Sequence, residues 1–313
     1  MKQGSILINL PISSNATPLV IPTSQIQFLH ATNTFINYNN NIINHPYKSS
    51  SRFIHHKHKY NTTTMVEQQI VDQTNGSVEQ IVTSNNNASV ERKPRILCLH
   101  GFRTSGKIFE TQTKKWPETV LEKVEFIFPD APFPCNGKSE VEGIFDPPYY
   151  EWFQFNKEFT DYENLDKCLE YIEELMIKQA PIDGLAGFSQ GAILSAALPG
   201  LQAKGLALTK VPKIKCLIIV SGAKLKNETW AEKAYSSPIQ CPSLHFLGDA
   251  DFLKPFGTEL LKSAEDAVVI RHPKGHTIPR LDEVGLETML KFIDRIQKIV
   301  SKKDDDVDKV VTV

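Results

Sequence analysis

One short segment holds the residue types that a nucleophilic serine requires. Residues 187–191 read Gly-Phe-Ser-Gln-Gly and match the pattern G-x-S-x-G. In this pattern the serine lies on a sharp turn between a strand and a helix, and the glycines leave room for close packing. An apolar stretch precedes the motif, and small apolar residues follow it. The pattern predicts that Ser189 is a nucleophile; the alternative is a tight turn without a catalytic role.

A serine hydroxyl is a weak nucleophile at neutral pH, so it requires a base. With this motif the partners follow in the order Ser, acid, His. Two histidines, His272 and His276, lie downstream of the acidic loop that follows residues 243–247. His272 adjoins a predicted strand, which favours a structural role. His276 lies on a loop after that strand, and we expect it to be the catalytic base.

Two carboxylates are candidates for the group that orients this histidine. Asp249 and Asp251 both lie in the loop at the end of the strand predicted over residues 243–247. We favour Asp251 as the catalytic acid, because an aspartate at the position of Asp249 also suits a capping or turn role.

A negative charge that develops on a carbonyl oxygen needs fixed N–H donors. The backbone N–H of Gln190, directly after the serine, is one expected donor. The loop after the first predicted strand should supply the second, and Phe102 is the candidate. His100 precedes a glycine in that loop, so we expect it to shape the loop rather than to take part in catalysis.

Strands and helices alternate along the chain. Strands are predicted over residues 95–99, 124–128, 183–188, 215–221, 243–247 and 268–271, and helices over 108–115, 163–179, from 192 onward and over 281–300. Alternation requires crossover connections, which produce a mostly parallel sheet with helices on both faces. The fold class is therefore α/β, with the working site at the carboxyl ends of the strands.

The two ends of the chain differ in composition from its middle. Residues 1–66 contain no Asp or Glu and are rich in Ser, Thr and Asn. We predict a disordered extension over 1–93, a folded domain over 94–300 and a charged disordered tail over 301–313. The extension has three interpretations: an organellar transit peptide, a segment upstream of a start at Met65, or a plain disordered tail.

Composition limits the partners and the compartment. The net charge of −1 gives no general attraction to nucleic acid, and no apolar run approaches the roughly 20 residues of a membrane span. The five scattered cysteines form no C-x-x-C pair, which disfavours a disulfide framework and a zinc site, and Cys98 and Cys216 read as free buried thiols. We expect a cytoplasmic protein, with the nucleus as a further location. If residues 1–64 are a transit peptide, we expect a plastid or mitochondrial protein instead.

Four motifs together resemble the FSH family of serine hydrolases. They are residues 97–106 (LCLHGFRTSG), 187–192 (GFSQGA), 248–251 (GDAD) and 275–279 (GHTIP). The resemblance extends over about 94–297 and implies a compact α/β-hydrolase with esterase or thioesterase activity on acyl substrates. It also implies that Ser189, Asp251 and His276 are nucleophile, acid and base. The acyl-protein thioesterases share GFSQG but usually have a further Gly at the position of Ala192.

An aromatic-rich stretch lies between the second predicted strand and the long helix. Its members Phe133, Tyr150, Trp152 and Phe153 are candidates for the wall of an apolar acyl pocket. The alternative is that these rings only pack the segment onto the sheet. If they line a pocket, medium or long acyl chains should be preferred.

The sequence thus predicts a serine hydrolase that cleaves acyl esters or thioesters through an acyl-enzyme, with no metal or cofactor. Its partner would be a small-molecule substrate; the oligomeric state stays open. Two alternatives remain: a receptor or scaffold that uses the same fold without catalysis, and an acyl-protein thioesterase.

Overall fold

The computed structural model describes residues 92–156 and 161–307, with side chains as far as Ser301. The predicted extension therefore lies outside the described residues, apart from residues 92 and 93. The strands of the main sheet are β1 (Arg95–Leu99), β2 (Glu125–Ile127), β7 (Gly184–Phe188), β8 (Cys216–Val220), β9 (Ser243–Gly248) and β10 (Ala267–His272). The helices are α2 (Gly106–Thr113), α3 (Glu118–Leu121), α4 (Leu165–Lys178), α5 (Gln190–Ala203), α6 (Glu228–Tyr235), α7 (Lys254–Leu261) and α8 (Glu283–Val307).

The six main strands form one sheet in the order β10-β9-β8-β7-β1-β2, and every neighbouring pair is parallel. The predicted α/β class with a parallel sheet is confirmed. From β1 the sheet grows toward β2 on one side and toward β7 on the other. The strand order therefore reverses between β1 and β7, and in open parallel sheets this point is where ligands bind.

The side chains of the central strands alternate between two apolar clusters, one on each face of the sheet. On β1, Leu97 and Leu99 belong to one cluster, whereas Ile96 and Cys98 belong to the other. Strand geometry requires this alternation, because successive side chains point to opposite faces. Strands buried on both faces read as continuous apolar runs, which is why the sequence identified them.

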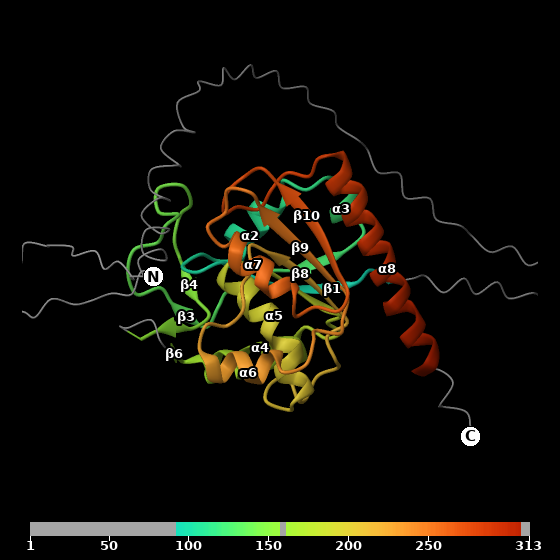
Figure 1. Ribbon diagram of the computed structural model, residues 1–313, viewed down its shortest axis with the longest axis horizontal. Coiled ribbons are helices and arrows are strands. Elements are labelled where there is room, and N and C mark those ends of the chain that lie inside the picture. The colour runs from blue at the N-terminus through green and yellow to red at the C-terminus, as the bar shows by residue number, and fades with distance from the viewer. Residues whose placement is uncertain (1–91, 157–160, 308–313) are drawn as a thin grey trace, which may run out of the picture. The chain divides into compact units, whose positions relative to one another are not determined.

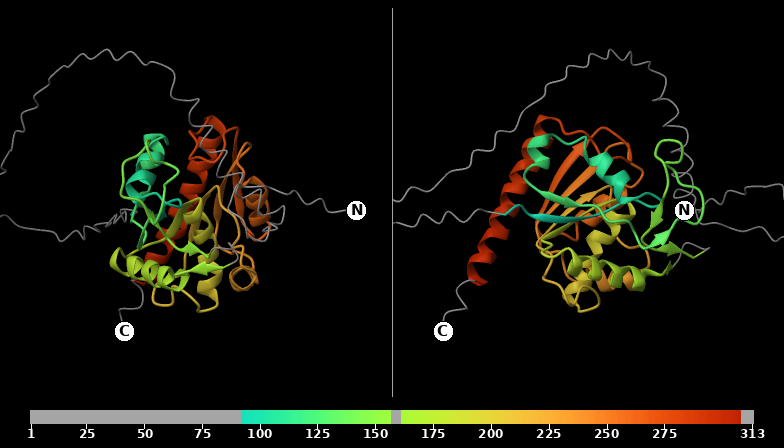
Figure 2. Two further views of the ribbon diagram at one scale, coloured as in Figure 1. Left: turned by 90° about the vertical axis from the view of Figure 1, so that its left-hand side faces the viewer. Right: turned by 180° about the vertical axis from the view of Figure 1, so that it is seen from behind.

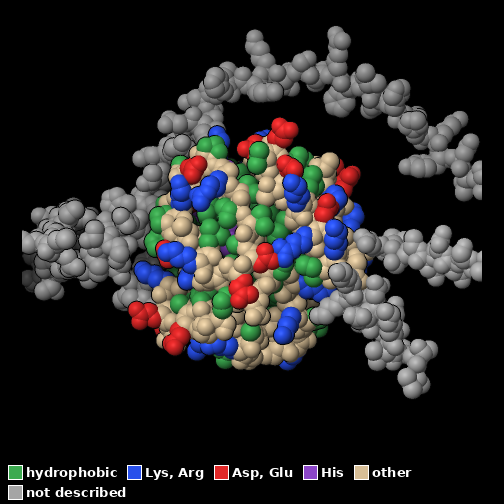
Figure 3. Space-filling model, turned by 45° about the vertical axis from the view of Figure 1, so that its right-hand side comes forward, with side chains coloured by type: hydrophobic (Ala, Val, Ile, Leu, Met, Phe, Trp, Pro, Cys, Tyr) green, Lys and Arg blue, Asp and Glu red, His purple; other side chains and the backbone are tan. Residues whose placement is uncertain are grey.

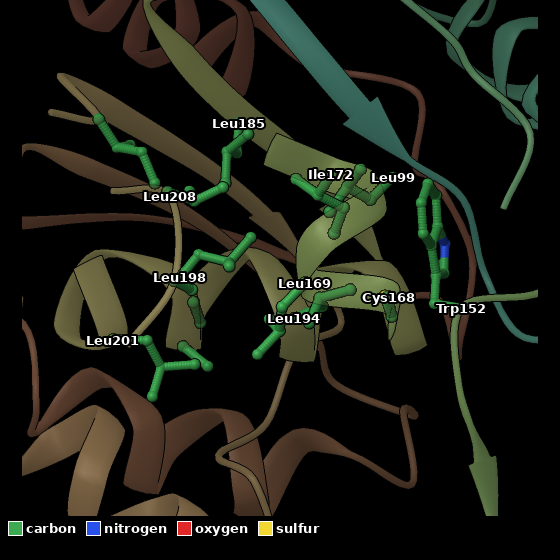
Figure 4. Packing of buried hydrophobic residues seen from close by; sticks show 14 of the residues in the cluster. Leu99, Trp152, Cys168, Leu169, Ile172, Leu185, Leu194, Leu198, Leu201 and Leu208 are labelled. Carbon is green, nitrogen blue, oxygen red and sulfur yellow. The ribbon is translucent and has the colours of Figure 1, made fainter. Parts of the chain in front are cut away.

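Helices cover both faces of the sheet (Figures 1 and 2). Buried apolar residues of α4, α5, α6 and α7 belong to the cluster that contains Leu97. Phe109 of α2 and the buried apolar residues of α3 and α8 belong to the other cluster. Figure 4 shows Leu194 and Leu198 of α5 and Leu169 and Ile172 of α4 within the cluster that contains Leu97. The amphipathic pattern of α4 is thus explained by one face packed on α5 and the sheet.

Two short hairpins lie in the connection between β2 and α4. They pair β3 (Phe133–Pro134) with β4 (Tyr150–Glu151) and β5 (Gln154–Phe155) with β6 (Tyr162–Glu163), each antiparallel. We call residues 133–155 the aromatic segment.

One end of the chain differs from the prediction. Helix α8 continues to Val307, whereas a disordered tail was expected from residue 301. The charges of residues 302–306 suggested the tail, but this stretch contains no Gly or Pro that would end the helix.

Buried histidines give the fold a defined acid sensitivity. His245 of β9 is 1% exposed, and its Nε2 lies 3.0 Å from Ser243 Oγ. Burial lowers the pKa of His245 from 6.5 to about 4, so the folded state resists a proton that the unfolded chain accepts. This contribution to stability is fully present above pH 6.5 and is lost as the pH falls toward 4.

We therefore predict that the free energy of unfolding falls between pH 7 and pH 4.5 by less in His245→Gln than in wild type. The difference should be at most about 3 kcal/mol, measured by urea denaturation at both pH values. Carboxylates whose pKa is lowered in the folded state also lose stability as the pH falls, but both proteins contain them, so their contribution cancels in the comparison. An equal loss of stability in both proteins would contradict the prediction.

Candidate active site

Ser189 lies on a strained turn where β7 passes into α5. Its φ is 54° and its ψ is −115°, an unusual conformation for a residue with a side chain. The turn is held by two backbone bonds: Ser189 N–H donates to Val220 O at 3.1 Å, and Ile193 N–H donates to Ser189 O at 3.0 Å. A residue kept in such a conformation by its neighbours marks a functional candidate.

The glycines on either side of Ser189 allow backbones to touch. A Cβ on Gly187 would overlap the carbonyl of Gly191, and one on Gly191 would overlap the carbonyl of Leu99 at the end of β1. Helix α5 can therefore start directly against β1 only because both positions lack a side chain. The G-x-S-x-G pattern is explained by these two contacts.

His276 and Asp251 are brought together by the loops after β10 and β9. His276 Nδ1 lies 3.0 Å from Asp251 Oδ1 and 3.2 Å from Oδ2. Their side chains are 7% and 2% exposed, so the pair is almost fully removed from water. A carboxylate at Nδ1 fixes both the orientation and the tautomer of an imidazole.

The imidazole of His276 also packs against two aromatic rings. Its centroid lies 4.9 Å from that of Phe188 and 4.6 Å from that of Phe252. Phe188 directly precedes Ser189, so this contact brings the histidine to the serine turn.

The structure distinguishes the two candidate acids. Asp251 accepts a hydrogen bond from Leu253 N–H at 2.8 Å in addition to its contact with His276. Burial alone would raise the pKa of Asp251, but the hydrogen bond and charge of His276 lower it below its usual value. Asp249 is exposed and pairs with Lys254 Nζ at 2.8 Å, so it faces solvent and not His276.

Lys115, which follows helix α2, contacts the loop that carries His276. Its Nζ donates to Ile278 O at 3.2 Å and lies 3.5 Å from Thr277 Oγ1. Burial and the charge of nearby Arg280 lower the pKa of Lys115. Thr277 and Ile278 are thus held to the segment that follows α2, a helix on the same face of the sheet as α8.

The loop after β1 passes beside the serine. A Cβ on Gly101 would lie 3.6 Å from Ser189 Cβ, which places the predicted donor Phe102 next along this loop. His100 is completely buried, and its Nε2 accepts from Ala131 N–H at 3.0 Å while its Nδ1 lies 2.8 Å from Gly101 O. The prediction that His100 shapes the loop is confirmed. Burial lowers its pKa to about 4, so it stays neutral at physiological pH.

The other predicted donor, Gln190, is the first residue of α5. The first N–H groups of a helix have no acceptor within the helix, which makes them suitable for an anion. Its side chain holds the aromatic segment: Oε1 accepts from Trp152 N–H at 3.1 Å, and Nε2 donates to Phe153 O at 2.8 Å. Trp152 Nε1 in turn donates to His100 O at 2.9 Å.

The predicted pocket residues separate into two pairs. Trp152 and Phe153 are completely buried in the apolar core and present no surface to a substrate in this structure. Figure 4 shows Trp152 against Leu99. Phe133 and Tyr150 pack against the same core but stay partly exposed, so a role in the pocket remains a prediction for these two.

His272, which we did not expect to be the base, is the last residue of β10 and is 6% exposed. Within the described residues, neither of its ring nitrogens has a hydrogen-bond partner.

All five cysteines are free, with Cys98 and Cys216 buried as predicted. The described residues contain no group of three or more His, Cys, Asp or Glu side chains suited to a metal ion. None of the helices they form combines the length and apolarity needed to cross a bilayer. On the face in Figure 3, charges of both signs are interspersed around hydrophobic side chains.

Sequence reasoning missed the polar residues that hold the site loops in place. Lys115, the side chain of Gln190, and the pairing of Arg103 with Glu151 at 2.7 Å were not identified. Each of these contacts joins residues that are far apart in the chain, so no local sequence pattern indicates it. Two of these residues do lie in motifs of the sequence: Arg103 in residues 97–106 and Gln190 in residues 187–192. Their polar side chains next to buried positions were the available signal.

Several known proteins are similar to this chain. The family model described as Serine hydrolase (FSH1) matches residues 89–286. Esterase OVCA2 from Bos taurus is 30% identical over 220 residues, which cover 64% of this chain and 96% of that protein. An uncharacterized hydrolase from Schizosaccharomyces pombe is 29% identical over 221 residues, 64% of this chain. The chain spans about half the length of that relative, 51%, and 44% of a second one from the same organism.

Among solved structures, Zea mays acyl-protein thioesterase 2 is similar at 20% identity with a TM-score of 0.47, covering 67% of this chain and 96% of that one. This likeness is slight, and the fold rests on the strand order of the sheet. The family match covers most of the chain, including the serine turn and both loops that carry Asp251 and His276. The chain therefore belongs to the FSH1 family of serine hydrolases.

Proposed function

We propose that this protein hydrolyses carboxylic esters or thioesters of acyl groups through a covalent acyl-enzyme on Ser189. One observation carries the proposal. The buried Asp251–His276 pair packs against Phe188, directly beside the strained turn that presents Ser189. A nucleophile, a base and a group that orients the base form the constellation that acyl transfer requires.

The proton transfers follow from the orientation of His276. Because Nδ1 faces the Asp251 carboxylate, the proton of Ser189 Oγ would pass to Nε2 as the oxygen attacks the acyl carbon. His276 then gives this proton to the leaving alcohol or thiol. In the second half-reaction His276 takes a proton from water, which attacks the acyl-enzyme and releases the acid.

The oxyanion of each tetrahedral intermediate would be held by the backbone N–H groups of Gln190 and Phe102. The first opens helix α5, and the second lies on the loop that passes Ser189. Donors fixed before the reaction stabilise the developing charge without reorganisation, and this is commonly the largest contribution to such catalysis.

For the acyl group we propose an apolar site formed in part by Phe133 and Tyr150. Both rings lie on the hairpin of β3 and β4, and Tyr150 N–H bonds to Thr104 O at 2.6 Å on the loop of the proposed oxyanion donor. Names of similar proteins also point to esters: Esterase OVCA2 is one of them.

Labelling with a fluorophosphonate tests the nucleophile and its base. Wild-type protein should be labelled, Ser189→Ala should not be labelled at all, and His276→Ala should react about 10³-fold more slowly because its serine is not activated. His272→Ala is the matched control and should retain labelling. A folded wild type that does not react would contradict the proposal and favour a binding role for the fold.

The two aspartates provide a second test. Asp251→Asn should lower kcat by about 10³- to 10⁴-fold, because the amide no longer fixes the tautomer of His276. Asp249→Asn should change kcat less than about twofold, since its partner is an exposed lysine. Steady-state ester hydrolysis distinguishes them, and equal losses in the two variants would refute the assignment of Asp251.

Acyl length tests the apolar site. Across p-nitrophenyl esters from acetyl to dodecanoyl, kcat/KM should rise with chain length as more methylene groups are buried. Phe133→Ala should reduce this rise, whereas Phe256→Ala, which removes an exposed ring of α7, should leave it unchanged. A flat dependence in wild type would exclude an acyl-binding site of this kind.

A further inference from the structure

Arg103 has a conformation and a set of partners that the proposed mechanism does not use. It follows Phe102, and its φ of 53° lies in the left-handed region, which is rare for a residue with a long side chain. Its Nε donates to Glu151 Oε1 at 2.7 Å. The Glu151 side chain is only 2% exposed, whereas that of Arg103 is 28% exposed.

The rest of the guanidinium is enclosed by a turn of the aromatic segment. Nη1 donates to Lys138 O at 3.0 Å and Nη2 to Asn136 O at 3.3 Å. A Cβ on Gly137 would lie 3.0 Å from Nη1, so this turn can approach only through a glycine, whose φ is +135°. Ser139 Oγ donates to Arg103 O at 2.6 Å, so this part of the aromatic segment also bonds to the backbone of Arg103.

These contacts hold Phe102 from two sides. The Arg103 guanidinium lies 4.8 Å from the centroid of the Phe102 ring, and the Phe155 ring meets Phe102 edge-on at 6.3 Å. On the far side of Arg103, Thr104 O accepts the hydrogen bond from Tyr150 N–H. The loop between His100 and Thr104 is thus fastened to the aromatic segment along its whole length.

We infer that Arg103 is a positioning residue that, through its ion pair with the buried carboxylate of Glu151, sets the place of the Phe102 N–H in the oxyanion site. This inference rests on the proposed function, because it assumes that Phe102 is an oxyanion donor. Arg103 itself touches no reacting atom.

The chemistry of the pair explains why an arginine is needed. A buried carboxylate is stable only when it is paired and hydrogen-bonded, so Glu151 fixes where the guanidinium must lie. The planar guanidinium reaches Glu151 and two carbonyls of the turn at once, whereas the ammonium of a lysine is a point charge that cannot match this geometry. A lysine should therefore keep the charge but release the loop.

The test compares an ester with the corresponding thionoester, in which C=S replaces C=O. Sulfur is a poor hydrogen-bond acceptor, so the ratio of kcat/KM for ester over thionoester reports how well the oxyanion donors are placed. Loss of folded protein scales both rates equally and leaves this ratio unchanged. We expect Arg103→Lys to lower the ratio about tenfold, with the pH dependence of kcat/KM unaltered because the Asp251–His276 pair is not disturbed.

Glu151→Gln keeps the shape and one acceptor but loses the charge, and it should give a ratio between wild type and Arg103→Lys. Glu151→Gln can also replace Arg103→Lys in this test if the latter fails to fold. The matched control is Arg295→Lys, which alters an exposed pair with Asp266 at the amino end of β10, away from the site; its ratio should equal that of wild type.

The outcomes separate this inference from the function on which it rests. A wild type without ester hydrolysis or fluorophosphonate labelling would refute the proposed function itself. If wild type is active and Arg103→Lys and Glu151→Gln have the same ester-to-thionoester ratio as wild type, the role of Arg103 is overturned and the proposed function stands. An equal decrease in Arg295→Lys would also overturn it, because the effect would then not depend on the loop.

Discussion

The rest of the structure depends on one close contact between backbones, at the point where the start of α5 meets the end of β1. The carbonyl of Leu99 occupies the space that a side chain on Gly191 would need. Because no Cβ intervenes, the helix begins against the neighbouring strand, and the serine turn lies beside the loop after β1. The contact also coincides with the reversal of strand order between β1 and β7. Ser189 and the loop that we propose as the source of an oxyanion donor are therefore adjacent as a consequence of packing.

The strain at Ser189 is tolerated because the surroundings determine it fully. A residue held in so unusual a conformation costs about 1–3 kcal/mol. The hydrogen bond to Val220 fixes the turn from the side of β8, and α5 is anchored beyond it by completely buried residues such as Leu194 and Leu198. Burying each of these leucines contributes about 1.5–3 kcal/mol, so the core can offset the local cost.

The sequence allowed prediction of the parts that have a local signature. The apolar run of β1 and the pattern around Ser189 are short, contiguous and readable, and the order of the loops with Asp251 and His276 follows the order of the strands. The choice between Asp249 and Asp251 was harder, because both follow β9 and only the folded chain turns one toward His276. The helical end of α8 was missed because charge alone does not distinguish the last turns of a helix from a tail.

The aromatic segment illustrates why the remainder could not be predicted. Its composition indicated burial, but not whether the rings face the core or a substrate. That choice is made by polar contacts with residues about 40–50 positions away: Gln190 bonds to the backbone of Trp152, and Trp152 bonds to His100. Such a pairing has no local pattern, because each partner alone is compatible with many environments.

The polar character of this network has a physical reason. Apolar packing favours burial but tolerates small displacements, whereas hydrogen bonds to buried groups are directional and costly to break. His100, Gln190 and Glu151 are all nearly without solvent exposure, and each has defined partners. Since burial holds the pKa of His100 near 4, its bond from Ala131 N–H persists throughout the neutral range. The loop beside Ser189 is therefore held in one conformation before any substrate arrives, which is the condition under which backbone N–H groups stabilise an oxyanion most effectively.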